Sequence, residues 1–313
     1  MWELYNALLA GLPRSGCVTR TVPGKRWTLA ETDLGGAGYA MSTEGSSIAP
    51  RFPHGIEGMR IKVAAEAAKS WNFTEAGLGI AVMNAFYNTE AHMAELGCAE
   101  PYDNYCLRGL DVAGKKVGLV GHLRMPPGTL DAAASVRILE KHPQPGDYPD
   151  SACEFILPDC DIVLITGSSL VNKTLPRLLE LCRGAYVVLT GPTVPLCPAL
   201  LELGIDRLAG MVVTDRAGAR RHAAECPRPA LLYGRTFPLR ISEHEAKKTG
   251  SLPPRPCCRW ASCFASLPAR CSPSSSGATP CPSKSSAAYS GTCPSSRLRH
   301  RAFWDGSMEA ARL

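Results

Sequence analysis

Residues 160–192, CDIVLITGSSLVNKTLPRLLELCRGAYVVLTGP, decide the fold. Two short runs rich in β-branched residues, DIVLIT and YVVLT, flank a segment whose leucines recur with a helical period. A strand that is apolar on both faces, then a helix, then a second such strand is typical of a parallel sheet covered on both sides. This segment therefore predicts an α/β protein.

The same rhythm extends outward from this segment in both directions. Further apolar, strand-like runs lie at residues 115–122, 135–140 and 208–215, and helical patterns lie at 150–158 and 195–204. Strands that alternate with helices in this way predict a Rossmann-like, doubly wound parallel-sheet domain, which we place at residues 109–245.

Residues 1–108 have a different order of elements and predict a small α+β domain. An apolar helical face opens the chain, three strand-like runs follow at 17–22, 26–33 and 37–42, and helical patterns begin at residue 56. Within them, Asn72 is the expected N-cap of a helix, with Glu75 as its capping-box partner. The helix that follows is apolar almost all round, so we expect it to be buried.

The end of the chain, residues 246–313, differs sharply in composition. Ser, Pro and Cys supply 28 of the 63 residues after residue 250, and no period of 2 or 3.6 remains. Such a segment buries too little apolar surface to offset the entropy of ordering it, so we expect a disordered tail. Because acidic residues nearly vanish there while Cys, Pro, Ser and Arg rise together, we also consider an out-of-frame reading of the gene.

The net charge of +6 belongs to this tail alone. Residues 251–313 hold eight basic and two acidic side chains, which leaves residues 1–250 neutral. A neutral body argues against a nucleic-acid or anionic-membrane surface. The chain has no run apolar enough to span a membrane and no basic residue before Arg14 to begin a signal peptide, so we expect a cytoplasmic protein. Eight of the fourteen cysteines lie in the body without metal-site spacing, and buried thiols are the expectation.

Ligands of parallel sheets bind at the carboxyl ends of the strands, which directs attention to the loops there. Gly121 and His122 end the run at 115–122, where a glycine would let a ligand approach and His122 would serve as metal ligand or acid/base group; a tight turn with a solvated histidine is the alternative. Glu140 ends the next run, 19 residues after Gly121. That spacing suits a ribose-binding acid, but the full glycine fingerprint is missing, and we favour a surface glutamate before a turn.

The loop after the run at 160–167 is the strongest candidate. It carries Thr166, Gly167, Ser168, Asn172 and Thr174 between a strand and a helix. Small hydroxyl residues and glycine at a helix N-terminus form an anion site from backbone N–H groups. A simple N-cap would account for one serine but not for the whole set.

Two further groups complete the candidate residues. Gly191, Pro192, Thr193 and Pro195 follow the next strand in a proline-rich loop, which suits preorganised binding or a helix entry with proline at its first position. Asn84 and Asn88 lie four residues apart on one face of an apolar helix at the domain interface. Buried amides need partners, so this pair either braces a loop or contacts a ligand, and we favour bracing.

Residues 139–215 contain the strings EKHPQPGD, TGSSLVNKT, GPTVP and LGIDRLAG, and on these the chain resembles the "putative heavy-metal chelation" family of proteins of unknown function. That family pairs a Rossmann-like domain with one similar to the N-terminal domain of enolases, which SWNFTEAGLGIAVMNAFYN matches. The resemblance covers about residues 1–240. It implies a cleft between the domains beside the loops named above, and a role in handling metals or metal-bearing cofactors.

We therefore expect a small anionic or metal-bearing ligand in this cleft, with His122 as the candidate metal ligand or catalytic group. The cofactor is left open between a metal ion and a metal chelate, and a homo-oligomer remains an open alternative for the assembly. One alternative function is a nucleotide- or S-adenosylmethionine-dependent enzyme with Glu140 on a ribose. The other is a non-catalytic scaffold. The sequence does not decide whether the protein is an enzyme.

Overall fold

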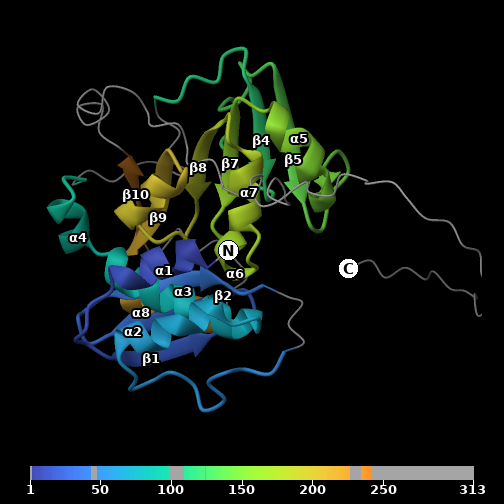
Figure 1. Ribbon diagram of the computed structural model, residues 1–313. Coiled ribbons are helices and arrows are strands. Elements are labelled where there is room, and N and C mark those ends of the chain that lie inside the picture. Colours follow the sequence, from blue (N-terminus) through green and yellow to red (C-terminus); the bar gives the residue numbers. More distant parts are fainter. Residues whose placement is uncertain (1, 44–47, 99–108, 124, 226–233, 241–313) are drawn as a thin grey trace, which may run out of the picture. The chain divides into compact units, whose positions relative to one another are not determined.

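The computed structural model describes residues 2–43, 48–98, 109–123, 125–225 and 234–240 (Figure 1). All of these belong to one compact unit, Met1–Cys257. The predicted disordered tail lies outside the described residues, and the proposed boundaries at residues 108 and 245 stay a prediction. In the described ranges, no helix has the length and hydropathy needed to span a lipid bilayer.

A seven-stranded sheet forms the larger layer. Its strands are β4 (Lys116–Val120), β5 (Ser135–Glu140), β6 (Tyr148–Pro149), β7 (Ile162–Thr166), β8 (Tyr186–Thr190), β9 (Arg207–Val213) and β10 (Gly234–Arg240). They lie in the order β10-β9-β8-β7-β4-β5-β6, and all neighbours are parallel except β10, which pairs antiparallel with β9. The α/β fold class predicted from the sequence is confirmed.

The strand order indicates the edge of the sheet at which a ligand site is expected. Counted along the chain from β4, the order is 3-2-1-4-5-6-7, so the direction of winding reverses between β4 and β7. Crevices at the carboxyl ends of strands beside such a reversal are where doubly wound sheets bind ligands. The loops that begin at Gly121 and Gly167 leave the sheet at this point.

Helices and 3₁₀ turns connect most of these strands. Between β6 and β7 lie η3 (Asp150–Ala152), α5 (Cys153–Ile156) and η4 (Leu157–Asp159); between β7 and β8 lie α6 (Ser168–Val171) and α7 (Leu175–Leu181). The 3₁₀ helix η5 (Pro198–Leu203) precedes β9, and α8 (Arg216–Glu225) follows it. The connection from β4 to β5 contains no helix in its described residues, 121–123 and 125–134.

The smaller sheet is antiparallel, with β1 (Val18–Pro23), β2 (Trp27–Thr32) and β3 (Ala37–Met41) in sequence order. Around it are α1 (Glu3–Ala10), α2 (Ile61–Ala65), η1 (Glu66–Lys69), α3 (Phe73–Tyr87) and α4 (Glu90–Glu95). Helix α3 packs on β2 and β3, and α8 packs on β2 and β1. All six residues of β2 are buried, so helices cover this strand on both faces. The likeness of residues 1–108 to the N-terminal domain of enolases stays a prediction.

Helix α3 shows one correct and one wrong local prediction. Asn72 caps it, because its side chain accepts a hydrogen bond from the Glu75 backbone N–H at 3.1 Å. The Glu75 carboxylate, however, does not return to Asn72. It accepts from the backbone N–H groups of Arg51 (3.0 Å) and Phe52 (2.6 Å), and the Asn72 N–H donates to Ser70 instead. A buried carboxylate bonds whichever orphan donors the fold brings close, and here a loop far along the chain supplies them.

The core is continuous across both sheets. One cluster joins α1 and α3 to the residues of α6 and α7 and to the strands of the large sheet, and the expected burial of α3 is confirmed. The Tyr5 hydroxyl donates to the Leu170 carbonyl at 2.6 Å across this contact. Of the body cysteines, Cys153, Cys160, Cys182 and Cys197 are buried, as expected. Cys17 and Cys98 are half-buried, and Cys106 and Cys226 lie outside the described residues.

Candidate functional site

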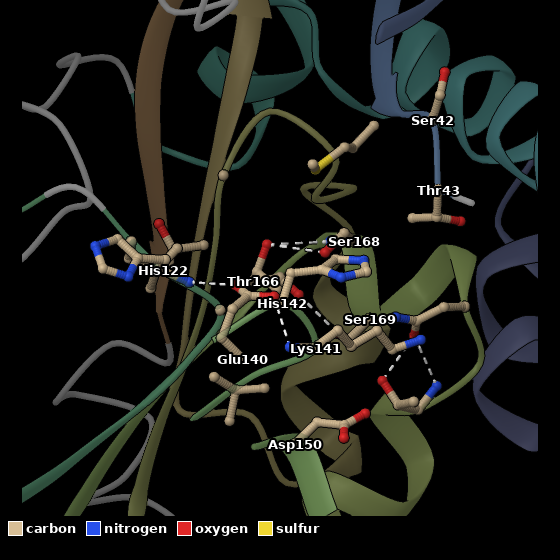
Figure 2. A pocket seen from close by; sticks show the side chains of 18 of the residues that line it. Ser42, Thr43, His122, Glu140, Lys141, His142, Asp150, Thr166, Ser168 and Ser169 are labelled. Atoms are coloured by element: carbon tan, nitrogen blue, oxygen red, sulfur yellow. Dashed lines mark hydrogen bonds between the residues drawn. The ribbon is translucent and has the colours of Figure 1, made fainter. Parts of the chain in front are cut away.

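A cavity of about 1550 Å³ opens at the carboxyl ends of the parallel strands (Figure 2). Its lining comes from the ends of β4, β5, β7 and β8, from the loops that follow them, and from α7 and α8. The turn between β1 and β2 contributes Lys25 and Arg26, and the residues after β3 contribute Ser42 and Thr43. The cavity therefore lies beside the reversal of strand order and is closed by segments distant in the sequence.

Gly121 allows the loop after β4 to lie close to the end of β7. Its φ is 96°, a region that side chains with a Cβ rarely adopt, and a Cβ there would lie 2.9 Å from the Thr166 Cγ2 atom. Any larger residue would strain the backbone and also push Thr166 away. The close approach of the two strand ends thus depends on a residue without a side chain.

Glu140 fixes the position of the same loop. Its carboxylate accepts hydrogen bonds from the backbone N–H of His122 (2.7 Å) and from that of Lys141 (2.7 Å). The end of β5 is thereby tied to the loop after β4. Glu140, the acid expected to bind a ribose, lines the cavity, but both of its carboxylate oxygens already accept hydrogen bonds from backbone N–H groups.

His122 is held at its side chain as well as its backbone. Its Nδ1 atom lies 3.0 Å from an Asp147 carboxylate oxygen, which also accepts from the Gln144 N–H at 2.9 Å. The Gln144 hydrogen bond, and then His122 itself, lower the pKa of Asp147 from its usual value, so the carboxylate is ionised near neutral pH. An ionised carboxylate only accepts hydrogen bonds. Nδ1 must therefore carry the proton, which leaves the Nε2 lone pair free to bind a metal or a proton.

The loop after β7 is rich in internal hydrogen bonds. The hydroxyls of Thr166 and Ser168 lie 3.2 Å apart, and the Ser169 hydroxyl donates to the Thr166 carbonyl at 2.7 Å. Asn172 accepts from the Thr174 hydroxyl (2.7 Å) and backbone N–H (3.2 Å). Neither serine caps a helix, because Gly167 occupies the cap position of α6. Helix α6 has only four residues, so its dipole contributes little to the predicted anion site.

Most of the predicted ligand-binding residues line the cavity, but three do not. The lining includes Gly121, His122, Glu140, Thr166, Ser168, Asn172, Thr174, Gly191 and Pro192. Gly167, Thr193 and Pro195 lie outside it. Thr193 is buried, and its hydroxyl accepts from the Met41 backbone N–H at 2.9 Å, which ties the loop to β3.

Asn84 and Asn88 connect α3 to the loop after β8. The Asn84 amide donates to the carbonyls of Tyr39 (2.7 Å) and Pro192 (3.3 Å). The Asn88 amide donates to the carbonyls of Val194 (2.9 Å) and Met211 (3.1 Å). Both side chains are buried and neither lines the cavity. These contacts fit bracing of the proline-rich loop rather than direct ligand contact.

Several cavity residues were not singled out from the sequence. His142 lies two residues after Glu140, and in Figure 2 its imidazole points towards Ser168, whereas that of His122 points away. The position of His142 two residues after Glu140 could have identified it from the sequence. No sequence signal could have identified Lys25 and Arg26, because they belong to a hairpin of the other sheet. Thr190, which ends β8, is 1% exposed, and its hydroxyl has no hydrogen-bond partner among the described residues.

The donor set of the described residues does not fit a bare metal ion. Within those ranges, no three His, Cys, Asp or Glu side chains gather closely enough to hold one. His122 and His142 are nitrogen donors on the cavity wall, and imidazole suits nickel, copper and zinc. A metal that brings part of its own ligand set would fit these two residues better than a free ion.

These features define an α/β protein in which a cavity opens at the carboxyl ends of a parallel-dominated seven-stranded sheet, beside a small antiparallel sheet. The chain belongs to the family described as "putative heavy-metal chelation": one family model matches residues 109–234 and a second, of the same description, matches residues 5–87.

The proteins similar to this chain include two solved structures and one curated protein. A protein of unknown function from the DUF364 family of Desulfitobacterium hafniense is 37% identical, with a TM-score of 0.69, and the match covers 77% of this chain and 99% of that one. Another DUF364 protein, from Pyrococcus horikoshii, is 26% identical, with a TM-score of 0.60, and the match covers 75% and 97%. An uncharacterised protein of Methanocaldococcus jannaschii is 28% identical over 159 residues, which are 47% of this chain and 58% of that relative.

Proposed function

We propose that the cavity binds a small anionic chelate of a transition-metal ion, with His122 as the protein's ligand to the metal. The observation that carries the proposal is the Asp147–His122 contact of 3.0 Å. Metal-binding histidines usually donate their other ring N–H to a carboxylate, which fixes the tautomer and makes the free nitrogen more basic. The family description, heavy-metal chelation, is in keeping with this arrangement.

The charges around the cavity favour an anionic ligand. Lys25, Arg26 and Lys141 line it and form no ion pair with any described residue. Glu140, the acid next to Lys141 in sequence, is engaged by two backbone N–H groups. The other acids of the lining are Glu154, which pairs with Arg177, and Asp150 and Glu225. Cations and hydroxyl groups that line one cavity, here together with Thr166 and Ser168, suit carboxylate or phosphate oxygens.

In this proposal the metal enters the cavity as part of the bound chelate. The chelator supplies most of the donors and carries the negative charge, and the imidazole of His122 adds one nitrogen ligand of the kind that nickel, copper and zinc accept. The cations of the cavity hold the anionic groups of the chelator. Because the chelator supplies most of the donors, the proposed site needs only one ligand from the protein to bind the metal. We assign no reaction to the site.

The test uses nickel citrate as the probe, with nickel chloride and citrate alone for comparison. Isothermal titration calorimetry of the wild type should give tighter binding of nickel citrate than of either component. His122→Ala should lose that advantage, because it removes the metal ligand, whereas His54→Ala, an exposed histidine outside the cavity, should keep it. Equal affinity of the wild type and His122→Ala for nickel citrate would contradict the proposal.

One observation supports the nucleotide alternative. The strand order is that of dinucleotide-binding sheets, and Glu140 ends the second strand of the domain, where such sheets bind a ribose hydroxyl. Those sites also use a helix that follows the first strand, and the described part of the β4–β5 connection has none. Thermal-shift measurements with S-adenosylmethionine, NAD and ATP test this alternative, which requires a raised melting temperature with at least one of them.

A further inference from the structure

Lys173 is a buried lysine among the residues that line the cavity. It is 8% exposed, lines the cavity, and follows α6 in the loop after β7. Its ammonium group donates to the Val171 carbonyl at 2.8 Å. It also lies over the rings of Tyr5 (5.4 Å to the centroid) and Phe73 (5.9 Å) from α1 and α3. Two aromatic faces and one carbonyl therefore surround the charge.

These contacts do not neutralise the charge. Among the described residues, no carboxylate lies within ion-pair distance of the Lys173 nitrogen. An ammonium group has three N–H donors, of which the Val171 carbonyl accepts one. A buried charge without a counter-charge is unfavourable, and burial accordingly lowers the pKa of Lys173 to about 8. An apolar residue of similar length would suit a purely structural role better.

The backbone at Lys173 is unusual as well. Its φ is 68°, the left-handed region, and no other non-glycine residue of the described ranges has a positive φ. Such a conformation is strained for a residue with a Cβ and persists only where neighbouring contacts enforce it. The Asn172 side chain does so here by accepting two hydrogen bonds from Thr174, the residue on the other side of Lys173. The loop thus holds a strained residue and an uncompensated cation in place together.

We infer that Lys173 is an anion-recognition residue of the cavity, whose ammonium group binds a carboxylate or phosphate group of the ligand. The inference rests on the proposed function in assuming that the ligand is anionic, and it goes further by naming the buried counter-charge. The bound anion supplies the missing partner and accepts the N–H donors that the protein leaves unused. Ion pairing favours the protonated amine, so the protein takes up a proton when the anion binds above the pH at which free Lys173 loses it.

The experiment measures binding of metal-free citrate and of inorganic phosphate by calorimetry near pH 9, in two buffers of different ionisation enthalpy. The wild type should bind at least one anion and take up a proton. Lys173→Met should weaken that binding roughly thirtyfold or more, as expected on removing one partner of a buried charge pair. Lys115→Met, an exposed lysine outside the cavity, should bind like the wild type.

Lys173→Arg provides a second measurement if the methionine variant does not fold. Arginine keeps the charge at all accessible pH values, so this variant should bind the anion without proton uptake. Three outcomes overturn the inference: no binding of either anion by the wild type, affinity of Lys173→Met within about twofold of the wild type, or no difference in proton uptake between the wild type and Lys173→Arg.

The two proposals can fail separately. Citrate binding that depends on Lys173, with no advantage for nickel citrate, leaves the anion site standing and removes the metal-chelate function. Tight binding of nickel citrate that depends on His122 but persists in Lys173→Met would support the metal-chelate function and remove the anion-recognition role of Lys173.

Discussion

The side-chain oxygen of Asn88 accepts a hydrogen bond from the backbone N–H of Leu196 at 2.8 Å. The amide nitrogen of the same residue donates to Val194 and Met211. A single buried side chain at the end of α3 therefore serves three backbone groups of the loop after β8 and of β9. Because these backbone groups are shielded from water, Asn88 is the means by which an irregular, proline-rich loop can lie inside the protein.

Replacing Asn88 should be severely destabilising. Asn88→Leu leaves three buried backbone groups without partners, each of which costs about 1 kcal/mol or more, so we expect a loss of roughly 3 kcal/mol or more in the free energy of unfolding. Urea denaturation followed by circular dichroism measures this loss. Asn6→Leu, on an exposed position of α1, should change the free energy by less than about 0.5 kcal/mol. Similar effects of the two substitutions would show that the hydrogen bonds of Asn88 do not stabilise the loop.

Strands β4, β7, β8 and β9 could be predicted from the sequence because each is largely buried and carries a continuous apolar run. The run of β5 was also predicted, although most of it is only half-buried, whereas the two exposed residues of β6 could not be predicted. Strand β10, GRTFPLR, could not, since it lies at the edge of the sheet and contains Pro238 and charged ends. Helix α8 shows a second limit. It follows β9 along the chain but packs on the smaller sheet, where Arg220 forms a double hydrogen bond with Glu31 at 2.6 and 2.8 Å. No periodicity within α8 indicates which sheet it will cover.

The candidate site, like the fold, could be predicted only in part. Sequence position identifies residues at the ends of predicted strands, but not residues that tertiary contacts bring to the same edge. Carboxyl ends of parallel strands share one edge, so residues such as His122, Glu140 and Thr166 could be grouped from their positions in the sequence alone. Lys25 and Arg26 could not be, because the docking of the hairpin against that edge depends on contacts between segments far apart in sequence. Lys173 was within the predicted loop, but only its burial and its positive φ distinguish it from a solvated lysine.

Gly121 offers a test of how closely the ends of β4 and β7 must approach. Gly121→Ala adds a Cβ only 2.9 Å from Thr166 and forces alanine into positive φ, so we expect a loss of about 2–3 kcal/mol in unfolding free energy and weaker nickel citrate binding. Gly128→Ala separates these causes: Gly128 has a φ of 84° but nothing within 4 Å of the added Cβ. Gly128→Ala should therefore lose only about 1 kcal/mol in the free energy of unfolding, from the unfavourable backbone conformation. Equal losses in both variants would mean that the contact with Thr166 does not matter.

The pair Asp147 and His122 predicts an acid-dependent contribution to stability. The pKa of Asp147 is lowered in the folded protein, chiefly by the Gln144 N–H and then by His122, so the folded state favours the ionised form. The resulting stabilisation is present above the unfolded pKa of about 3.9 and is lost as the pH falls through the lower, folded value.

Asp147→Asn should therefore be less stable than the wild type at neutral pH, and the difference should shrink as the pH falls below about 4. Urea unfolding at several pH values measures it, with the exposed Asp131→Asn as the control for loss of one negative charge. A difference that stays constant from neutral to acid pH would show that ionised Asp147 is not the stabilising form. In the neutral range, nitrogen NMR of the His122 ring should also show that Nδ1 carries the proton in the wild type.

Lys173 predicts a second pH dependence of stability, this time in the alkaline range. Burial lowers its pKa to about 8, against about 10.4 in an unfolded chain. Between these values the unfolded state binds more protons at this amine than the folded state does, so stability rises with pH. The interval of about two and a half pKa units corresponds to roughly 3 kcal/mol, which the wild type should gain relative to Lys173→Met between neutral pH and about pH 10.

At neutral pH Lys173→Met should be as stable as the wild type or more so, because it removes a buried charge that has no carboxylate partner in the described residues. Urea unfolding across this pH range measures the difference, and Lys115→Met corrects for the loss of one exposed positive charge. If Lys173→Met is instead less stable by the same amount at every pH, the aromatic contacts with Tyr5 and Phe73 are the main role of the lysine. A structural role of that kind would require the ammonium group to stay protonated throughout, whereas an anion-binding role requires the charge to be costly until the ligand arrives.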